Sequence, residues 1–257
     1  MNRPVLFSLL VVALACGQKT SLLSSSDLIV QRMDENRLPL SARSIEMDSD
    51  IVLCRYEFRS EDCLCHSFPL LVCNGRNIGT VTVNGRIVEP VMGVHVMDDG
   101  DLCFSLSGIV HDGENTIELK SEGGVPAVCL AGDFSVLRSE DGEWYVAPEK
   151  TLSPGLVASQ GLPFYSGDIS YSRQYEFPEK KGRHILRVPG WEGDACKVFV
   201  NGDEFADLHS GHFKKNVSPV LNPGVNYVEI RVTCHGLPFS TDSDFRDCGL
   251  AGDFSIE

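Results

Sequence analysis

One seven-residue segment occurs twice in this chain and constrains the fold more than any other feature. Residues 130–136 read L-A-G-D-F-S-V and residues 250–256 read L-A-G-D-F-S-I, so six of the seven positions are identical. In each copy Leu, Gly, Phe and a β-branched residue alternate with the other three residues, which predicts a strand. A glycine inside a strand usually marks a bulge or a close backbone approach. Because each copy closes a long segment, we expect two related units in tandem.

Other sequence markers recur in the same order. Tyr56-Glu57-Phe58 matches Tyr175-Glu176-Phe177, Val83-Asn84-Gly85 matches Val200-Asn201-Gly202, and the turn at 112–115 matches the turn at 222–226. Matched positions lie between 111 residues (118 to 229) and 120 residues (133 to 253) apart. Solenoid repeats recur every ~20–50 residues, so this spacing indicates a duplicated domain with altered loop lengths.

The pattern of short apolar runs and turns predicts an all-β protein. Asn-Gly between two alternating runs, as at 84–85, is a strong hairpin signal because both residues tolerate positive φ. No stretch shows a long helical periodicity, and the 24 glycines fit frequent turns. We expect one β-sandwich over residues 28–137, opening with a strand at 28–30, and a second over 156–257. Residues 138–155 are predicted to be a packed connection.

The N-terminal residues resemble an export signal. Arg3 precedes an apolar run over residues 5–15, and Ala13 and Ala15 provide small residues before a cleavage point. Cys16 follows directly, which leaves two interpretations open: plain secretion, or cleavage before a lipidated Cys16 on a cell-surface lipoprotein. Ala13 stands where the usual lipobox has Leu. In a third interpretation the run is a buried strand. We expect residues 1–16 to be the signal, residues 17–27 a polar tether, and the protein to be exported.

The cysteines and the net charge narrow the class of protein further. Of ten cysteines, those at positions 54, 73, 103, 129 and 234 lie in apolar runs, which predicts buried free thiols. One or two disulfides remain an alternative, with Cys63 and Cys65 in the least constrained positions. The net charge of −14 repels phosphate backbones, so no nucleic acid partner is expected. A membrane contact is expected only through a lipid anchor.

Two strings resemble glycoside hydrolases. V-x-V-N-G at 198–202, followed by a G-x-N turn and the apolar strand ending at Ile230, resembles the sugar-binding jelly-roll domain of the β-galactosidase and β-glucuronidase superfamily. Residues 160–167, Q-G-L-P-F-Y-S-G, resemble the opening of the last sandwich in α-L-rhamnosidase-like enzymes, and the N-R-L-P-L string at 36–40 is similar to the same region. This resemblance covers residues 28–257 and implies two tandem jelly-roll (galactose-binding-like) β-sandwich domains.

The same resemblance implies an accessory role. Those enzymes carry their catalytic acid and base on a separate (β/α) barrel, and this sequence has neither its alternating strand–helix pattern nor room for its ~250 residues. We therefore predict a non-catalytic carbohydrate-binding or accessory protein whose partner is a carbohydrate or a glycoside hydrolase. The alternative is a structural tail or remnant of a larger rhamnosidase-like enzyme, and a stand-alone glycosidase is the third hypothesis.

Three aromatic residues are candidates for carbohydrate binding. Apolar sugar faces stack on aromatic rings, while the hydroxyl groups need polar partners. Trp191, inside P-G-W-E-G at 189–193, is expected in a loop at one end of the second sandwich, either presenting its ring or folding back over the edge. Tyr165 and Trp144 are the further candidates, and packing between the two units is their alternative interpretation.

No cofactor is expected, with one reservation for calcium. Asp242, Asp244 and Asp247 alternate with other residues in a loop, a spacing of oxygen ligands that suits Ca²⁺. The glycine and the distant glutamate of a full EF-hand loop are missing from this stretch. A solvated acidic loop is therefore the alternative interpretation of these three residues.

Overall fold

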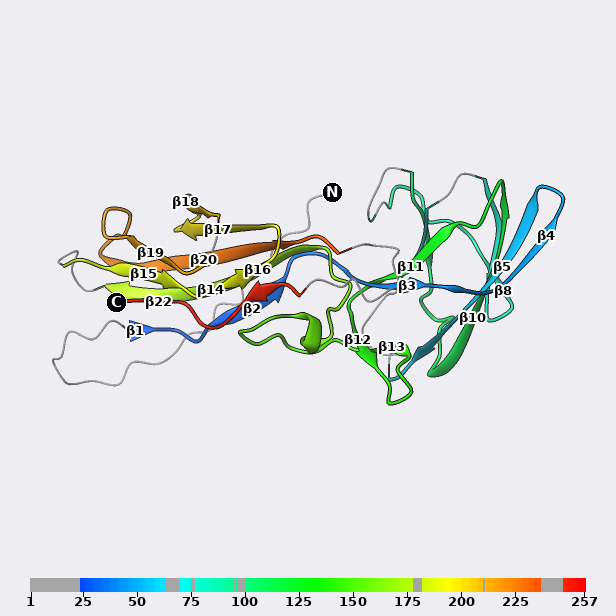
Figure 1. Ribbon diagram of the computed structural model, residues 1–257, viewed down its shortest axis with the longest axis horizontal. Helices are drawn as coiled ribbons and strands as arrows, with labels where there is room; N and C mark the ends of the chain where they lie inside the picture. Colours follow the sequence, from blue (N-terminus) through cyan, green and yellow to red (C-terminus); the bar gives the residue numbers. More distant parts are fainter. Residues whose placement is uncertain are drawn as a thin grey trace.

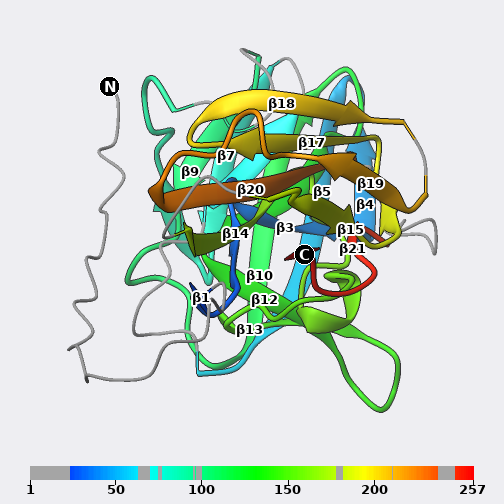
Figure 2. The ribbon, with the colours of Figure 1, turned by 90° about the vertical axis from the view of Figure 1, so that its left-hand side faces the viewer.

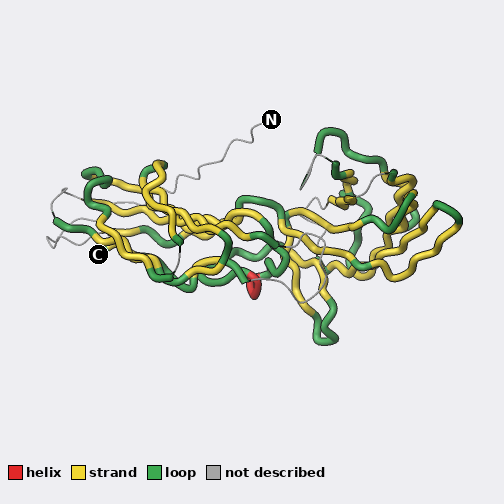
Figure 3. Tube along the Cα trace, turned by 45° about the horizontal axis from the view of Figure 1, so that its top comes forward, coloured by secondary structure: helices red, strands yellow, loops and turns green. Residues whose placement is uncertain are grey.

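The computed structural model describes residues 24–62, 70–74, 77–94, 96, 100–177, 182–209, 211–236 and 247–257. This part of the chain is built from β-strands, and the helix found in it is one 3-10 turn, η1 (Ala158–Gln160) (Figure 3). The prediction of an all-β protein is therefore confirmed. In the described residues no helix has the length and apolar character needed to cross a bilayer.

The strands follow one another along the chain as β1 (Ser24–Ser25), β2 (Ile29–Arg32), β3 (Asn36–Leu40), β4 (Ala42–Asp48), β5 (Ile51–Ser60), β6 (Leu70–Asn74), β7 (Ile78–Val83), β8 (Arg86–Val88), β9 (Leu102–Ser105), β10 (Gly113–Glu122), β11 (Ala127–Gly132), β12 (Phe134–Arg138), β13 (Trp144–Pro148), β14 (Gly167–Phe177), β15 (Ile185–Val188), β16 (Trp191–Glu192), β17 (Ala195–Val200), β18 (Asp203–Leu208), β19 (Phe213–Asn216), β20 (Gly224–Cys234), β21 (Gly249–Leu250) and β22 (Ser255–Ile256).

Two sheets form the N-terminal half. A seven-stranded sheet has the order β12-β13-β5-β10-β7-β8 with β4 paired to β5, and a four-stranded sheet has the order β3-β11-β6-β9. Strand β5 shows why they pack: Val52, Cys54, Tyr56 and Phe58 are buried while the residues between them are more exposed. These side chains belong to one buried cluster that includes residues of both sheets. In Figure 1 β4, β5 and β10 lie at one end of the molecule.

The C-terminal half repeats this arrangement around a second buried cluster. A six-stranded sheet has the order β1-β14-β20-β17-β18 with β2 paired to β14. A three-stranded sheet, β19-β15-β22, and a two-stranded sheet, β16-β21, are separate from it. Figure 2 shows β18, β17, β20 and β14 side by side. Strand β20 alternates strictly, with Asn226, Val228, Ile230 and Val232 buried. A more exposed outer face and a buried inner face follow from this alternation.

Three elements depart from the sequence prediction. The predicted tether at 17–27 contains β1, which pairs with β14. The strand expected at 28–30 in the N-terminal sandwich is β2. It pairs with β14 of the C-terminal sheet, and its Val30 belongs to the second buried cluster. The predicted connection at 138–155 contains β13, which pairs with β12 and with β5. The pairings of β2 with β14 and of β13 with β5 join residues distant in sequence, so no local pattern predicts them. Strands β12 and β13 form a local hairpin.

The repeated motif is a strand interrupted at its aspartate, and not the single strand predicted. In the first copy β11 ends at Gly132 and β12 begins at Phe134, in a different sheet, with exposed Asp133 at the break. The second copy has a wider break, over residues 251–254 between β21 and β22, and Asp253 lies within it. The phenylalanine after each aspartate, Phe134 or Phe254, is fully buried. Each motif therefore passes a strand around a corner of the core.

A buried asparagine gives the clearest evidence of duplication. Asn115 binds the backbone of His111 and Gly113 and accepts a hydrogen bond from the Asn84 side chain at 2.8 Å. Asn226 binds the backbone of Asn222 and Gly224 and accepts a hydrogen bond from Asn201 at 2.9 Å. The two halves thus share a hairpin and a turn tied together by an asparagine pair.

The same register corrects one of the sequence matches. Asn115 lies opposite Phe58, whereas Asn226 lies opposite Tyr175. Phe58 therefore corresponds to Tyr175, and the two Y-E-F strings are offset by two residues. The likeness of those strings reflects similar strand composition at non-equivalent positions.

The cysteines follow the prediction with one exception. Cys54, Cys73, Cys103 and Cys129 are buried and free, as predicted, and so is Cys196. Cys234, predicted to be a free thiol, forms a disulfide with Cys248, with a Cα–Cα distance of 5.9 Å. Cys234 ends β20 and Cys248 directly precedes β21. The bond therefore holds the end of one strand against the start of the next. Cys16, Cys63 and Cys65 lie outside the described residues.

Candidate functional site

A small charged cavity lies where β2 meets the first repeated motif. Its volume is about 160 Å³. We call it the Arg32 pocket, and it is lined by Arg32, Met33, Asp34, Glu35, Asp133 and Glu149. This space is large enough for several water molecules or for part of a small polar ligand. Three separate segments build it: the end of β2, the motif corner, and the residue that follows β13.

Arg32 is the centre of the pocket. Its Nη2 donates to Asp133 Oδ1 at 2.7 Å, its Nε donates to Glu149 Oε1 at 2.8 Å, and its Nη1 donates to the Asp34 carbonyl at 2.7 Å. The guanidinium side chain is 10% exposed, whereas those of Asp133 and Glu149 are 58% and 50% exposed. Burial lowers the pKa of Arg32, but the hydrogen bonds and charges of the two carboxylates outweigh burial and raise it overall. Arg32 therefore stays a fixed cation that orients two solvent-facing carboxylates.

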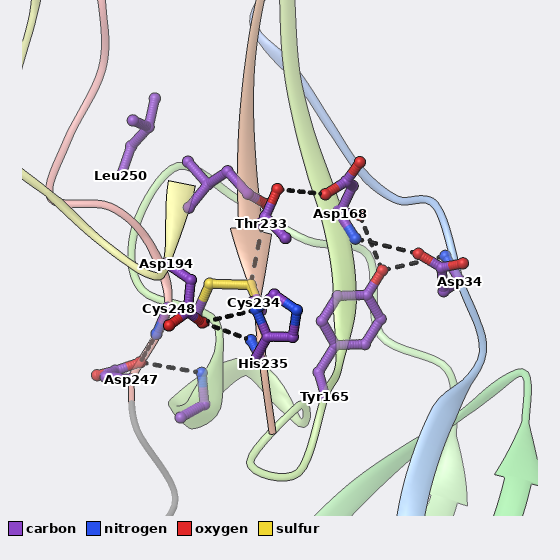
Figure 4. The surroundings of a disulfide bond; sticks show 12 residues. Asp34, Tyr165, Asp168, Asp194, Thr233, Cys234, His235, Asp247, Cys248 and Leu250 are labelled. Carbon is purple, nitrogen blue, oxygen red and sulfur yellow. Dashed lines mark hydrogen bonds and ion pairs between the residues drawn. A yellow bond between two sulfur atoms is a disulfide. The ribbon is translucent and has the colours of Figure 1, made fainter. Parts of the chain in front are cut away.

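Tyr165 fixes the backbone of the pocket. Its hydroxyl oxygen accepts hydrogen bonds from the amides of Met33 at 3.1 Å and Asp34 at 3.0 Å, and its proton is donated to the Asp168 carbonyl at 2.8 Å. Figure 4 shows Asp34, Tyr165 and Asp168 turned toward one another. Burial raises the pKa of the Tyr165 hydroxyl above its usual range, so it remains protonated. Tyr165 is a sequence-predicted candidate, and the structure places it behind the pocket with its ring buried.

The hydrogen bonds continue from this tyrosine to the disulfide. Asp34 Oδ2 accepts the amide of Asp168 at 3.0 Å, and Asp168 Oδ1 accepts the hydroxyl of Thr233 at 2.7 Å. Thr233 precedes Cys234, whose bond to Cys248 lies in the same region (Figure 4). The backbone that shapes the pocket is therefore supported by a covalent bond as well as by hydrogen bonds.

The sequence predicted Trp191 in a loop. The structure places it in the short strand β16. It pairs with Leu250 of the second repeated motif and packs, partly buried, against the second cluster. Its indole Nε1 is buried and has no hydrogen-bond partner among the described residues. This position corresponds to Leu71, which pairs with Leu130 in the first half. The strand pairing makes Trp191 part of the sandwich edge.

Trp144 also packs against the protein interior. It lies in β13, with its ring edge-to-face on Phe164 at 5.1 Å and the Arg138 guanidinium at 5.4 Å from its ring centroid. Phe164 belongs to the cluster of the N-terminal half, and Tyr165 belongs to the other cluster. The string at 160–167 therefore joins the two buried clusters. The three predicted aromatic residues are not brought together into one site.

The predicted calcium loop is described only at Asp247. Its Oδ1 accepts the amides of Ala158 at 3.3 Å and Cys248 at 3.1 Å. Asp242 and Asp244 lie outside the described residues. Among the residues that are described, no three His, Cys, Asp or Glu side chains are grouped to hold a metal ion.

The Arg32 pocket was missed by sequence reasoning. Asp133 was noticed as part of the repeat, but Arg32 and Glu149 stand in stretches without a motif. The sequence signal was the repeat of the aspartate itself. The structure shows that Asp253, at the matching place, binds Arg173 Nη2 at 2.7 Å. In both halves the repeated aspartate binds an arginine. The sequence shows that the aspartate repeats but does not show which arginine it binds.

Comparisons with known proteins returned glycoside hydrolases. No protein-family model matches the chain, and no curated protein matches it. Among solved structures, an α-L-rhamnosidase of Streptomyces avermitilis complexed with L-rhamnose matches 91% of this chain and 28% of its own, at 13% identity and a TM-score of 0.33. A rhamnosidase from Novosphingobium sp. PP1Y matches 90% of this chain and 24% of its own, at 16% identity and a TM-score of 0.34.

A β-glucuronidase of an uncultured Clostridium species matches 46% of this chain and 26% of its own, at 20% identity and a TM-score of 0.30. Further matched structures are family 2 glycoside hydrolases and a β-D-mannosidase. The chain thus spans between a quarter and a third of these enzymes. They are the enzyme classes that the sequence resemblance names, and each is matched over part of its length.

Proposed function

We propose that this protein is a non-catalytic carbohydrate-binding or accessory module, and that the Arg32 pocket contacts the sugar. The observation that carries the proposal is the pair of half-exposed carboxylates, Asp133 and Glu149, held by one buried arginine. Each carboxylate keeps lone pairs free to accept hydrogen bonds from hydroxyl groups. Because Arg32 and Tyr165 fix the geometry beforehand, a ligand does not have to order the site.

The arrangement of the carboxylates supports binding over hydrolysis. Glycoside hydrolysis needs two carboxyl groups facing each other across the scissile bond, about 5–9.5 Å apart. Asp133 and Glu149 instead converge on the same guanidinium group. Because both carboxylates are ion-paired with this arginine, we assign them to recognition.

Paired amide variants test the proposal by affinity electrophoresis. We expect the native protein to be retarded in gels that contain a soluble polysaccharide it recognises. Asp133→Asn with Glu149→Gln keeps the shape of both side chains but weakens charge-assisted hydrogen bonds to hydroxyls. The double variant should lose most of this retardation. It should remain folded in a thermal melt, because the amide oxygens introduced at positions 133 and 149 still accept the hydrogen bonds of the buried Arg32.

Glu143→Gln is the matched control. Glu143 is an exposed carboxylate, 66% accessible, outside the pocket lining. Its Oε1 lies 3.0 Å from Arg43 Nη2. This variant should migrate like the native protein in every gel. Equal retardation of the double variant and the native protein would remove the pocket from recognition, and a native protein retarded by no glycan would overturn the function.

A second candidate function is a structural one, in which the chain is the tail of a larger glycoside hydrolase. The edge strand β4 favours it, because Ile45 and Met47 are exposed large hydrophobic side chains on a strand paired on one side with β5. Exposed apolar surface at a sheet edge suits a protein partner. Replacing both residues by threonine should abolish association with such an enzyme and leave glycan retention unchanged.

A further inference from the structure

The Arg32 pocket carries more negative than positive charge. Its lining contains one base, Arg32, and four acids, Asp34, Glu35, Asp133 and Glu149. With every group ionised, its formal charge is therefore 1 − 4 = −3. The whole chain has the same sign, with a net charge of −14, so the surface around the pocket does not reverse this potential.

The one cation of the pocket is already bound by the protein. All three nitrogens of the Arg32 guanidinium donate hydrogen bonds: Nε to Glu149, Nη1 to the Asp34 carbonyl and Nη2 to Asp133. The side chain is 10% exposed, whereas the two carboxylates that it holds are about half exposed. A ligand that enters the pocket therefore meets the carboxylates before it meets the guanidinium.

The carboxylates keep oxygen atoms for such a ligand. Asp133 contacts Arg32 through Oδ1 and Glu149 contacts it through Oε1. Within the part of the chain that the structure describes, Asp133 Oδ2 and Glu149 Oε2 accept no hydrogen bond, and the exposed Glu35 carboxylate forms neither a hydrogen bond nor an ion pair. Each of these oxygens can accept a hydrogen bond from a donor of the ligand.

The matching corner of the C-terminal half shows that the fold does not need this excess of acids. Arg173 there binds one carboxylate, Asp253 at 2.7 Å, and its other acceptor is the Phe254 carbonyl at 3.1 Å. One carboxylate balances one guanidinium at that corner. The additional acids around Arg32 repel one another, so the corner geometry alone does not explain them, and a cationic ligand would offset this repulsion.

The chemistry of the pocket favours an organic cation. Among the described residues no three His, Cys, Asp or Glu side chains are grouped to hold a metal ion. An ammonium group has three N–H donors and no acceptor, and its hydrogen bonds to carboxylates are about twice as strong as those between neutral groups. A carboxylate or sulfate on the ligand would instead be repelled by the acids of the lining.

We propose that the Arg32 pocket selects a saccharide that carries a protonated amino group, and that this ammonium group donates hydrogen bonds to Asp133 and Glu149. Glu35 contributes through its charge. This inference rests on the proposed carbohydrate-binding function and adds to it the class of ligand, an amino sugar with a free amine.

Two matched oligosaccharides test the proposal. The hexamer of β-1,4-linked glucosamine and the hexamer of β-1,4-linked N-acetylglucosamine have the same length and linkage, and the free amine is what distinguishes them. Titration calorimetry is carried out at about pH 6, where amines are protonated and carboxyl groups of ordinary pKa are ionised. At ~0.15 M salt the Debye length is ~8 Å, so acids remote from the ligand are largely screened. We expect the native protein to bind the glucosamine hexamer about tenfold more tightly.

Single and double amide variants then locate the binding. Glu35→Gln removes one charge of the pocket and leaves every hydrogen bond of Arg32 in place, so it should weaken binding of the glucosamine hexamer about threefold and leave the N-acetylated hexamer unaffected. Asp133→Asn with Glu149→Gln should abolish the preference for the free amine. Glu143→Gln, which removes the same single charge outside the pocket lining, is the control and should bind both hexamers as the native protein does.

The outcomes separate this inference from the proposed function. Equal affinity for the two hexamers, lost for both in the double variant, would overturn the inference and leave the proposed function intact. A preference for the free amine that Glu143→Gln weakens as much as Glu35→Gln does would also overturn the inference, because the attraction would then come from the acidic surface as a whole. A native protein that binds neither hexamer and is retarded by no polysaccharide would overturn both.

Discussion

At the scale of single residues, two buried asparagines explain why the halves fold alike. Asn115 and Asn226 are fully buried, and each binds two backbone carbonyls, one backbone amide and the side chain of a hairpin asparagine. The hairpin residues Asn84 and Asn201 have positive φ, as the Asn-Gly signal predicted. Their buried partners were visible in the sequence only as the end of a G-x-N string, because the contact spans two strands.

Replacing one buried asparagine measures what this network contributes. Asn226→Ala removes the hydrogen bonds to Asn222, Gly224 and Asn201 and leaves buried partners unsatisfied. At ~1–3 kcal/mol for an unsatisfied buried group, we expect the free energy of unfolding to fall by about 3 kcal/mol. Urea unfolding followed by circular dichroism measures it. Asn222→Ala, at an exposed side chain, is the control and should change it by less than ~0.5 kcal/mol.

Trp191 shows where residue-level prediction fails. The P-G-W-E-G string has the composition of a loop, yet Trp191 pairs with Leu250 in a short ladder. The deciding partner belongs to the repeated motif, almost sixty residues later in the chain. A local string cannot show that pairing. The ring is partly buried, as in the interpretation in which Trp191 folds back over the sandwich edge.

At the scale of elements, the alternation of apolar and polar residues predicted most strands. It did not predict that a strand near one half pairs with the sheet of the other half. The hairpin of β7 and β8 and the long strands β5 and β20 follow directly from their patterns. Strand β2 lies in the sheet of the other half because Val30 fits the second cluster and Tyr165 binds the turn after it. That exchange also builds the Arg32 pocket, which explains why the site was not predictable from local patterns.

The disulfide between Cys234 and Cys248 can be tested with a reducing agent. Cys234 and Cys248 are 14 residues apart, and closing a loop of that length stabilises a protein by about 3 kcal/mol in the chain-entropy model. We expect a reducing agent to lower the free energy of unfolding of the native protein by about 2–4 kcal/mol. The variant Cys234→Ala with Cys248→Ala should start at the lower value and respond to no reductant. Equal stability of the native protein in oxidising and reducing buffer would contradict the assignment.

At the scale of the whole molecule, one string ties the two buried clusters together. Phe164 packs in the N-terminal cluster and against Trp144, while Tyr165 packs in the C-terminal cluster. Asn36 Nδ2 also donates to the Gly161 carbonyl at 2.9 Å. The sequence marked this string through its resemblance to glycoside hydrolases, but its role as the junction is visible only in the packing. The two halves should therefore unfold together.

Calorimetry of a junction variant tests this coupling. We expect the native protein to unfold in one transition, because separating the halves exposes Phe164 and breaks the Asn36 contact. Phe164→Ala should cost about 3–5 kcal/mol, as large aromatic truncations in cores do, and should split the transition into two. The control is Phe205→Ala on β18, where a partly buried ring lies far along the chain from the junction. Two transitions in the native protein would show that the halves are independent.

A glycan array probed with the purified protein tests whether the Arg32 pocket binds carbohydrate. The native protein should bind a defined set of glycans, and the same glycans should lose their signal with Asp133→Asn and Glu149→Gln in one chain. The Glu143→Gln control should reproduce the native pattern. Carbohydrate binding by the Arg32 pocket would be contradicted if the native protein binds no glycan above background. It would also be contradicted if the pocket variant binds as the native protein does.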